Sequence, residues 1–317
     1  MKKQFSILAA AGTLFMAAMA GCGSSKATYT YTVGSNPYGI AVDSSGFIWV
    51  ANYGSSTVTA LSSNGSAFTY TAGANPFAIA VDKSGDIWVT NSGSNNVIKL
   101  TSGGSMTYTV NSSYPRGIAI DASGNIWTAN FGSNTVTKLN SFGGYVNSFT
   151  VGTNPNGIAL DSAGNIWVAN YGSNTVTELN PSGTILGTYS TGSNPFGIAI
   201  DKSGNAWVTD YGSNQVTVLG PTGTTIGTYG AGYTPTCIAI DNGGTIWVAD
   251  NGNNMVTALS STGTTVKTYG TGTAPMGIAI DSSGNVWISN SGGTTLTVLM
   301  GETKGPQYFP YSGPQWP

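Results

Sequence analysis

The sequence contains no histidine among its 317 residues, and only 7% of the residues are charged. The absence of histidine excludes Ser-His-Asp and Cys-His catalytic arrangements and every metal site with a histidine ligand. Lys and Arg together number 10, Arg116 is the single arginine, and no basic stripe is present. Nucleic-acid binding therefore has little electrostatic support.

A long apolar run lies near the start of the chain, from Phe5 to Ala20. It follows the positively charged Lys2 and Lys3, separated from them by Gln4. The run is too short and wrongly flanked for a stable membrane span, but it fits the apolar region of a signal peptide. It leads into Met19-Ala20-Gly21-Cys22, which resembles the bacterial lipobox, in which small residues fit the signal peptidase and the cysteine becomes the acylated first residue.

We therefore expect a lipoprotein signal peptide over residues 1–21, lipidation of Cys22 and a short tether over residues 22–27. The lipid would hold the protein firmly on a membrane of the bacterial cell envelope, on an outer-membrane, periplasmic or extracellular face, because each buried CH₂ contributes ~0.8 kcal/mol. An ordinary secretory signal with an unrelated cysteine is the alternative. Cys237 then has no partner and is interpreted as a small buried side chain, with a reactive thiol as the alternative.

Helical periodicity is missing from the rest of the chain, whereas glycine is abundant at 46 residues. This composition is typical of short strands joined by tight turns. With 40% hydrophobic and 11% aromatic residues, the chain can still bury a large core.

Tryptophan shows that the chain is a repeat. Seven tryptophans follow one another at intervals of 39 or 40 residues, and an aspartate precedes each of them by six residues. The tryptophans are Trp49, Trp88, Trp127, Trp167, Trp207, Trp247 and Trp287. A period near 40 with strand-like residues predicts the blades of a β-propeller.

One repeat shows the four strands that we expect in each blade. Asn154-Pro155-Asn156-Gly157 carries Pro and Gly in positions that suit a type I turn, and Asp161-Ser-Ala-Gly164 reads as a hairpin loop in which Gly takes a positive φ. The expected strands run over Gly157–Asp161, Asn165–Asn170, Thr175–Leu179 and Ile185–Ser190.

The two ends of the repeat region predict how the ring closes. The seventh repeat supplies three strands, over Gly277–Asp281, Val286–Asn290 and Thr295–Met300, and the missing outer strand is Thr28–Val33. We therefore expect an all-β, seven-bladed β-propeller over residues 28–300, closed by an N-terminal strand that completes the last blade, one strand plus three. The propeller is expected to be monomeric, and residues 301–317 read as a Pro-rich tail.

The recurring pattern Asn-Pro-x-Gly-Ile-Ala-x-Asp-x-x-Gly-x-x-Trp-Val-x-Asn resembles the NHL-repeat propellers. More narrowly, it is similar to the streptogramin (virginiamycin B) lyase-like family, over about residues 28–300. The resemblance implies a propeller whose relatives use histidine and acidic residues in a central cleft. Their histidine positions match the variable site after Pro, which here holds Tyr, Phe, Arg, Asn, Thr or Met, so the activity does not carry over.

Two positions change from repeat to repeat, and both are expected on one face of the ring. After the Pro come Tyr38, Phe77, Arg116, Asn156, Phe196, Thr236 and Met276; after the strand-ending Asn or Asp come Tyr53, Ser92, Phe131, Tyr171, Tyr211, Asn251 and Ser291. We predict a ligand site made of Tyr38, Phe77, Arg116, Phe196, Tyr53, Phe131, Tyr171 and Tyr211, for a glycan, a peptide or another envelope polymer. The alternative is that these rings only fill the gaps between blades.

The strand-ending position gives a further candidate. It is Asn in five repeats and aspartate in two neighbouring ones, Asp210 and Asp250. Hard cations prefer such oxygen ligands, so Ca²⁺ or Mg²⁺ could bind there, although no cofactor is required. The alternative is that each side chain closes its own turn.

The sequence therefore predicts a lipid-anchored binding or interaction module. A divalent-metal-assisted lyase or lactonase-type hydrolase, with Asp210 or Asp250 as base, is the first alternative. A purely structural scaffold is the second.

Overall fold

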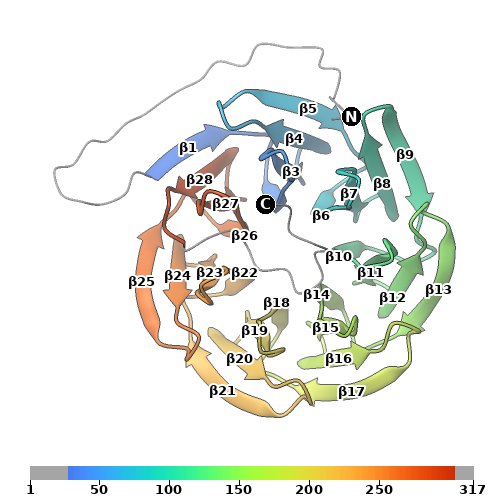
Figure 1. Cartoon of the computed structure of the whole chain (residues 1–317), viewed down its shortest axis with the longest axis vertical. Coiled ribbons are helices and arrows are strands. Elements are labelled where there is room, and N and C mark those ends of the chain that lie inside the picture. Colours follow the sequence, from blue (N-terminus) through green and yellow to red (C-terminus); the bar gives the residue numbers. More distant parts are fainter. Residues whose placement is uncertain (1–27, 304–317) are drawn as a thin grey trace.

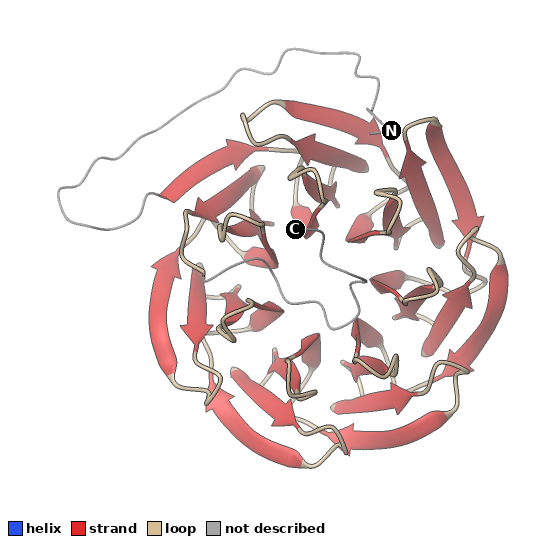
Figure 2. Ribbon diagram, viewed as in Figure 1, coloured by secondary structure: helices blue, strands red, loops and turns tan. Residues whose placement is uncertain are grey.

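Each repeat folds into one four-stranded antiparallel sheet, and the computed structural model, which describes residues 28–303, arranges seven such sheets in a ring (Figure 1). The described residues form strands joined by turns and bends, without helices (Figure 2). Over residues 28–303, accordingly, no helix is long and apolar enough to cross a membrane. The predicted seven-bladed β-propeller is confirmed.

The strands of a blade follow one another from the centre of the ring outwards. The innermost strands are β2 (Pro37–Val42), β6 (Pro76–Val81), β10 (Pro115–Ile120), β14 (Pro155–Leu160), β18 (Pro195–Ile200), β22 (Pro235–Ile240) and β26 (Pro275–Ile280). The second strands are β3 (Ile48–Asn52), β7 (Ile87–Asn91), β11 (Ile126–Asn130), β15 (Ile166–Asn170), β19 (Ala206–Asp210), β23 (Ile246–Asp250) and β27 (Val286–Asn290).

The two outer positions of each blade are equally regular. The third strands are β4 (Thr57–Leu61), β8 (Asn96–Thr101), β12 (Thr135–Leu139), β16 (Thr175–Leu179), β20 (Gln215–Leu219), β24 (Met255–Leu259) and β28 (Thr295–Leu299). The outer strands are β5 (Ala67–Thr71), β9 (Gly104–Thr109), β13 (Tyr145–Thr150), β17 (Ile185–Ser190), β21 (Thr225–Gly230), β25 (Thr265–Gly270) and, in the last blade, β1 (Thr28–Thr32).

The start of the inner strand differs from the sequence prediction. We expected a turn over residues 154–157, but Pro155 already pairs with Asn170 of β15, and the register shifts by a bulge between Pro155 and Ile158. The chain turns instead at Asn154, whose φ is 51°. Asn tolerates this left-handed conformation, and Pro is acceptable as the first residue of a strand, where its missing N–H does no harm.

The spacing of aspartate and tryptophan has a direct structural cause. In the fourth blade, Asp161 Oδ1 accepts the backbone N–H groups of Ala163 and Asn165, and Asp161 Oδ2 accepts the Nε1–H of Trp167 at 3.1 Å. The same carboxylate–indole bond occurs in every blade, at 2.8 to 3.4 Å. One side chain therefore closes the hairpin and satisfies the indole N–H, which would otherwise be buried without a partner.

The tryptophans then build the core between blades. Trp167 is fully buried and packs against Ile198 and Val208 of the next blade, while Tyr189 of the outer strand stacks on it at 5.7 Å between ring centroids. Equivalent clusters recur around the ring. Because each cluster joins two neighbouring blades, the core is continuous only when the ring is closed.

The ring closes as predicted, with the first strand of the chain completing the last blade. β1 pairs antiparallel with β28 over five residues, from Thr28↔Leu299 to Thr32↔Thr295. Tyr31 of β1 lies 5.4 Å from Trp287, in the place that Tyr189 holds beside Trp167. Strand β1 therefore supplies the same core aromatic as the outer strand of any other blade.

The strand directions define two faces of the ring. The upper face carries the loops that lead into the inner strands, such as residues 151–154, and the turns between the second and third strands, such as residues 171–174. The lower face carries the aspartate hairpins, such as residues 161–164. At the centre the inner strands approach closely: a Cβ on Gly157 would lie 2.5 Å from the Phe196 carbonyl oxygen of the next blade. Small residues there allow a narrow central channel.

Candidate functional site

The two variable positions meet on the upper face because their loops are bonded to each other. In the fourth blade, Tyr171 N–H donates to the Asn154 carbonyl at 3.1 Å, and Gly172 N–H donates to the Thr153 carbonyl at 2.9 Å. The Asn154 side chain also donates through Nδ2 to the Phe131 carbonyl of the preceding blade, at 2.9 Å. These bonds hold the residue after the strand-ending Asn beside the inner strands of its own and the neighbouring blade.

One group of predicted residues forms an aromatic cluster over the first two blades. Tyr38 and Tyr53 stack with their ring centroids 4.6 Å apart, and Phe77 meets Tyr38 edge-on at 5.3 Å. Phe77 lies 6.4 Å from Tyr53. All three rings are half-buried, so each one packs on its neighbours and still leaves part of its surface accessible.

A second cluster covers the third to fifth blades. Tyr171 is at its centre, with Phe131 at 6.1 Å, Tyr211 at 6.2 Å and Phe196 at 6.4 Å between ring centroids. Phe196 and Tyr211 are themselves 6.1 Å apart. The structure thus brings all seven predicted rings into two clusters on one face.

Arg116 joins the two clusters. Its guanidinium carbon lies 3.5 Å from the centroid of the Phe131 ring and 5.1 Å from that of Phe77. Nη1 donates to Asn156 Oδ1 at 3.1 Å. Burial among these groups lowers the pKa of Arg116, because the charged form loses hydration, although nearby Tyr53, Tyr38 and Tyr171 oppose the shift. An arginine remains protonated even so.

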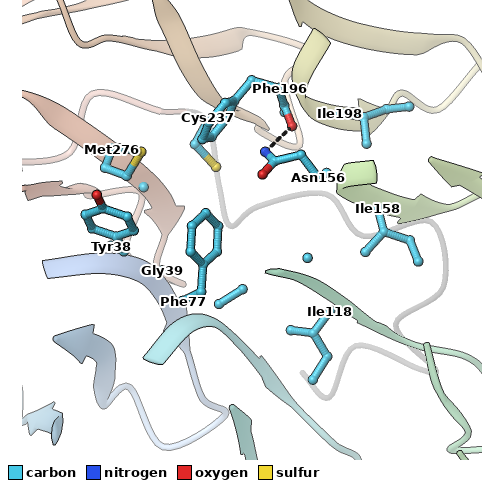
Figure 3. Close-up of a pocket in the computed structure, with 15 residues that line it drawn as sticks. Tyr38, Gly39, Phe77, Ile118, Asn156, Ile158, Phe196, Ile198, Cys237 and Met276 are labelled. Atoms are coloured by element: carbon cyan, nitrogen blue, oxygen red, sulfur yellow. Dashed lines mark hydrogen bonds between the residues drawn. The ribbon is translucent and has the colours of Figure 1, made fainter. Parts of the chain in front are cut away.

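Beside Arg116 the central channel contains a cavity of about 160 Å³. Figure 3 shows Tyr38, Phe77, Cys237 and Met276 around it. Below them the wall is built from Gly and Ile residues of the inner strands: Gly39, Gly117, Gly157, Gly197, Gly277, Ile118, Ile158 and Ile198. Among the lining side chains, polar atoms come only from Tyr38, Asn156 and Cys237. The cavity therefore suits an apolar group.

The isoleucines of this wall were missed at the sequence level. They were interpreted only as part of a short apolar strand, because nothing in a Gly-Ile-Ala run distinguishes a side chain that faces the channel from one that faces the next blade. The signal available in the sequence was that the Gly-Ile-Ala run recurs directly after the variable position, which places its isoleucine near the site.

The polar members of the variable positions serve the scaffold. Asn156 is 2% exposed and donates through Nδ2 to the Phe196 carbonyl at 2.9 Å. Thr236 is fully buried and donates to the Pro275 carbonyl at 3.1 Å, and Asn251 Nδ2 donates to the same carbonyl at 3.2 Å. These side chains link neighbouring blades. Asn156 also accepts the hydrogen bond of Arg116, whereas Thr236 and Asn251 bond to backbone carbonyls.

Asp210 and Asp250 lie at the ends of their strands and are fully buried. Thr217 donates to Asp210 Oδ2 and Thr257 to Asp250 Oδ2, both at 2.6 Å, and Gly232 N–H donates to Asp250 Oδ1 at 3.0 Å. Burial raises the pKa of each carboxyl to about 6, although these hydrogen bonds favour the charged form.

Each of these carboxylates is thus bonded within its own blade and the loop that leads into it. Within residues 28–303, no three or more Cys, Asp or Glu side chains are grouped to hold a metal ion. The cation site at Asp210 and Asp250 gains no support from this geometry and stays a prediction.

Of the two cysteines, the structure describes Cys237 but not Cys22. Cys237 is a free cysteine in the channel wall, and burial raises the pKa of its thiol, which keeps it protonated at neutral pH. The predicted signal peptide, Cys22, the predicted tether and tail residues 304–317 lie outside the described residues.

The fold is shared with several solved structures. A streptogramin B lyase superposes with a TM-score of 0.78 at 22% identity, covering 85% of this chain and 97% of that one. A catalytically inactive histidine-to-alanine variant of the virginiamycin B lyase from Staphylococcus aureus, solved with quinupristin, gives 0.79 at 20% identity, covering 86% and 99%. Hydrazine synthase from Kuenenia stuttgartiensis gives 0.77 at 17% identity, covering 85% and 97%. At these identities the likeness shows the fold alone.

Sequence comparison is more specific about the family. No curated protein matches the chain. Residues 112–303, more than half of the chain, match the virginiamycin B lyase family. This match covers the blades that carry Arg116, the second aromatic cluster and both buried aspartates, and this chain is a member of the virginiamycin B lyase family.

Proposed function

We propose that this protein is a ligand-binding module of the bacterial cell envelope, whose upper face takes a glycan, a peptide or another envelope polymer. The observation that carries the proposal is the gathering of seven aromatic rings and the chain's one arginine on a single face, over an apolar cavity. Aromatic faces stack on sugars and apolar groups, and a concave apolar site with few polar groups is typical of ligand pockets.

The rings do more than fill gaps between blades. Rings that serve packing, such as Tyr189, lie in the outer strands against a buried tryptophan. The seven rings of the upper face contact one another and Arg116 instead, and each of them is half-buried. Accessible aromatic surface on a rigid scaffold supports a binding role.

The test is an unbiased screen of the purified protein against glycan and peptide arrays. Combined replacement of Tyr171, Tyr211 and Phe196 by alanine is expected to weaken the ligand found there at least tenfold, about 1.4 kcal/mol. The reason is that it removes the stacking surface of the second cluster. Calorimetric titration measures the affinity, and circular dichroism confirms that the ring remains folded.

Phe142→Ala is the matched control, because Phe142 is an aromatic residue that is 84% exposed but lies in a lower-face turn. It should leave the affinity unchanged. Blank arrays for the wild-type protein would instead favour the structural scaffold. Equal loss of affinity in the control would place the ligand elsewhere on the ring.

The lipid on Cys22 belongs to the same proposal. β1 begins at the lower face, since Thr28 pairs with Leu299, which pairs in turn with Val286 at the start of its strand. The described chain therefore begins at the lower face, and an anchor ahead of Thr28 would leave the upper face free for a ligand. Cys22→Ser is expected to move the protein from the membrane fraction to the soluble fraction; unchanged membrane association would contradict the anchor.

A metal-assisted lyase or lactonase-type hydrolase is the second candidate, favoured by the family match. This chain has no histidine to act as base. Burial and the neighbouring Tyr53 raise the pKa of Tyr38, so its phenol does not supply a base at neutral pH either. The remaining candidates, Asp210 and Asp250, are fully buried and already accept hydrogen bonds from threonines. Binding without turnover is therefore the better-supported function.

A further inference from the structure

Unlike Lys99 and Lys267, Arg116 has no carboxylate partner among residues 28–303; Lys83 and Lys138 also lack one, but both donate to backbone carbonyls. Lys99 forms ion pairs with Asp82 at 3.2 Å and Asp86 at 2.9 Å, and Lys267 lies 4.0 Å from Glu302. Within residues 28–303, Arg116 makes no ion pair, and its guanidinium is bonded to a neutral amide and covered by rings.

Within residues 28–303, no accessible carboxylate is paired with Arg116. The upper-face loops and turns, such as residues 131–134, 151–154 and 171–174, contain no Asp, Glu, Lys or Arg in any blade. The two carboxylates at this end of the ring, Asp210 and Asp250, have no exposed surface and accept hydrogen bonds from their own threonines. Among the described residues, a half-buried positive charge therefore lies on an upper face without other accessible charges, which favours an anionic partner.

The guanidinium is fixed in orientation before any ligand arrives. One of its faces lies on the Phe131 ring at 3.5 Å, and Nη1 donates to Asn156 Oδ1. Asn156 is in turn held by its own Nδ2, which donates to the Phe196 carbonyl. A guanidinium has five N–H donors in one plane, so one bond to an amide leaves donors for a planar carboxylate.

The cavity lies directly beside this cation, since Phe77 and Asn156 both contact Arg116 and both line the cavity wall. Its remaining wall is apolar, with Ile118 and Ile158 at the sides (Figure 3). A ligand that fits both features carries a negative group and an apolar group a few atoms apart. A sugar acid offers the charge but covers itself with hydroxyls, which an apolar cavity leaves without partners.

We propose that Arg116 is the receptor for a ligand carboxylate, and that the ligand is a peptide C-terminus whose apolar last side chain enters the channel. The carboxylate pairs with the guanidinium edge, while the side chain lies against Phe77 and the isoleucines. This inference rests on the proposed binding function and assigns it a ligand chemistry.

The experiment uses two probes that differ only in charge, N-acetyl-phenylalanine and N-acetyl-phenylalaninamide, titrated into the purified protein and followed by NMR. The acid is expected to bind the wild-type protein at least tenfold more tightly than the amide, and added salt should reduce this preference. Arg116→Gln should abolish the preference. Arg116→Lys should retain part of the preference for the acid, since the positive charge stays but the planar guanidinium with its paired N–H donors is lost.

Lys83→Gln is the control, because it removes one positive charge from the lower face, where Lys83 donates to the Ala122 carbonyl. It should keep the full preference. Equal binding of acid and amide, no measurable binding of either, or a preference that survives Arg116→Gln would overturn the inference. Binding of digalacturonate in preference to N-acetyl-phenylalanine would overturn the peptide ligand in favour of an acidic glycan.

The outcomes separate this inference from the proposed function. If the arrays find a neutral ligand whose affinity depends on Tyr171 and Tyr211 but is unchanged by Arg116→Gln, the carboxylate receptor is contradicted and the binding function is supported. Conversely, acid binding that depends on Arg116 but not on these rings would support the receptor and contradict the aromatic site.

Discussion

A chain that begins at Gly34 is expected to lose its cooperative fold, whereas one that begins at Thr28 keeps it. The shorter chain lacks β1, the outer strand of the last blade, and with it the five-residue pairing to β28. It also lacks Tyr31, which packs on Trp287. Loss of buried aromatic surface and of a complete strand costs about 5 kcal/mol or more, comparable to the whole stability of a domain.

Thermal unfolding of the two chains, followed by near-ultraviolet circular dichroism, measures this effect. The shorter chain also presents β28 as a free edge, so it should aggregate. A synthetic peptide of residues 28–33 added in trans should restore the melting transition by strand addition. Melting of the Gly34 chain within a few degrees of the Thr28 chain would show that ring closure does not depend on β1.

The fold could be predicted because each blade repeats the same physical requirements. Trp167 and its six equivalents mark the period, and the surplus strand at one end matches the missing strand at the other. The role of Asp161 was only half predicted. Its turn-closing bonds follow from local sequence, but its bond to Trp167 Nε1 depends on how the hairpin folds the second strand back over the turn.

The boundaries of the inner strands were less predictable. Pro and Gly in residues 154–157 are strong turn signals, yet the turn is confined to Asn154 and the strand starts at Pro155. Local propensity does not reveal that Pro155 can pair with Asn170 across a bulge, because that pairing is set by the neighbouring strand.

The candidate site could be predicted in outline but not in depth. Variation between repeats pointed to the seven rings that form the two aromatic clusters and to Arg116 between them, because a position free of scaffold duties can vary. Asn156 and Thr236 vary too, yet they are buried and bonded across blades. Nor did the sequence show that Arg116 lacks a carboxylate partner, since that depends on which residues the ring brings together.

The second large effect is expected from replacing both buried aspartates by asparagine. The pKa of Asp210 and Asp250 is raised from 3.8 in the unfolded chain to about 6 in the fold. The folded protein therefore binds more protons than the unfolded one between about pH 4 and pH 6, and the free energy of unfolding falls as pH rises through this window. Above pH 6 the loss amounts to about 3 kcal/mol per carboxyl.

Asparagine removes this titration and fits the same position. Asn170 Nδ2 donates to Thr177 at 2.9 Å, and Asn91 Oδ1 accepts the Gly73 N–H at 3.1 Å, so each of the two bonds that Asp250 makes has an amide counterpart in another blade. The double variant should therefore be more stable than the wild type at pH 7.5, with the advantage disappearing below about pH 4. Urea unfolding at several pH values measures it.

Asp161→Asn is the matched control. This carboxylate is half-exposed, and its Oδ2 accepts the Trp167 indole N–H. An amide has only one oxygen, so it cannot accept this bond and the backbone bonds of Oδ1 together. It should destabilise the protein at pH 7.5, opposite in sign to the double variant.

The same measurement also bears on the cation site predicted for Asp210 and Asp250. If Ca²⁺ or Mg²⁺ raises the melting temperature of the wild type, and the double variant is less stable and insensitive to these ions, then the carboxylates bind metal. In that case the metal-assisted alternative replaces the explanation by burial, because only a bound cation would make two buried charges more favourable than two amides.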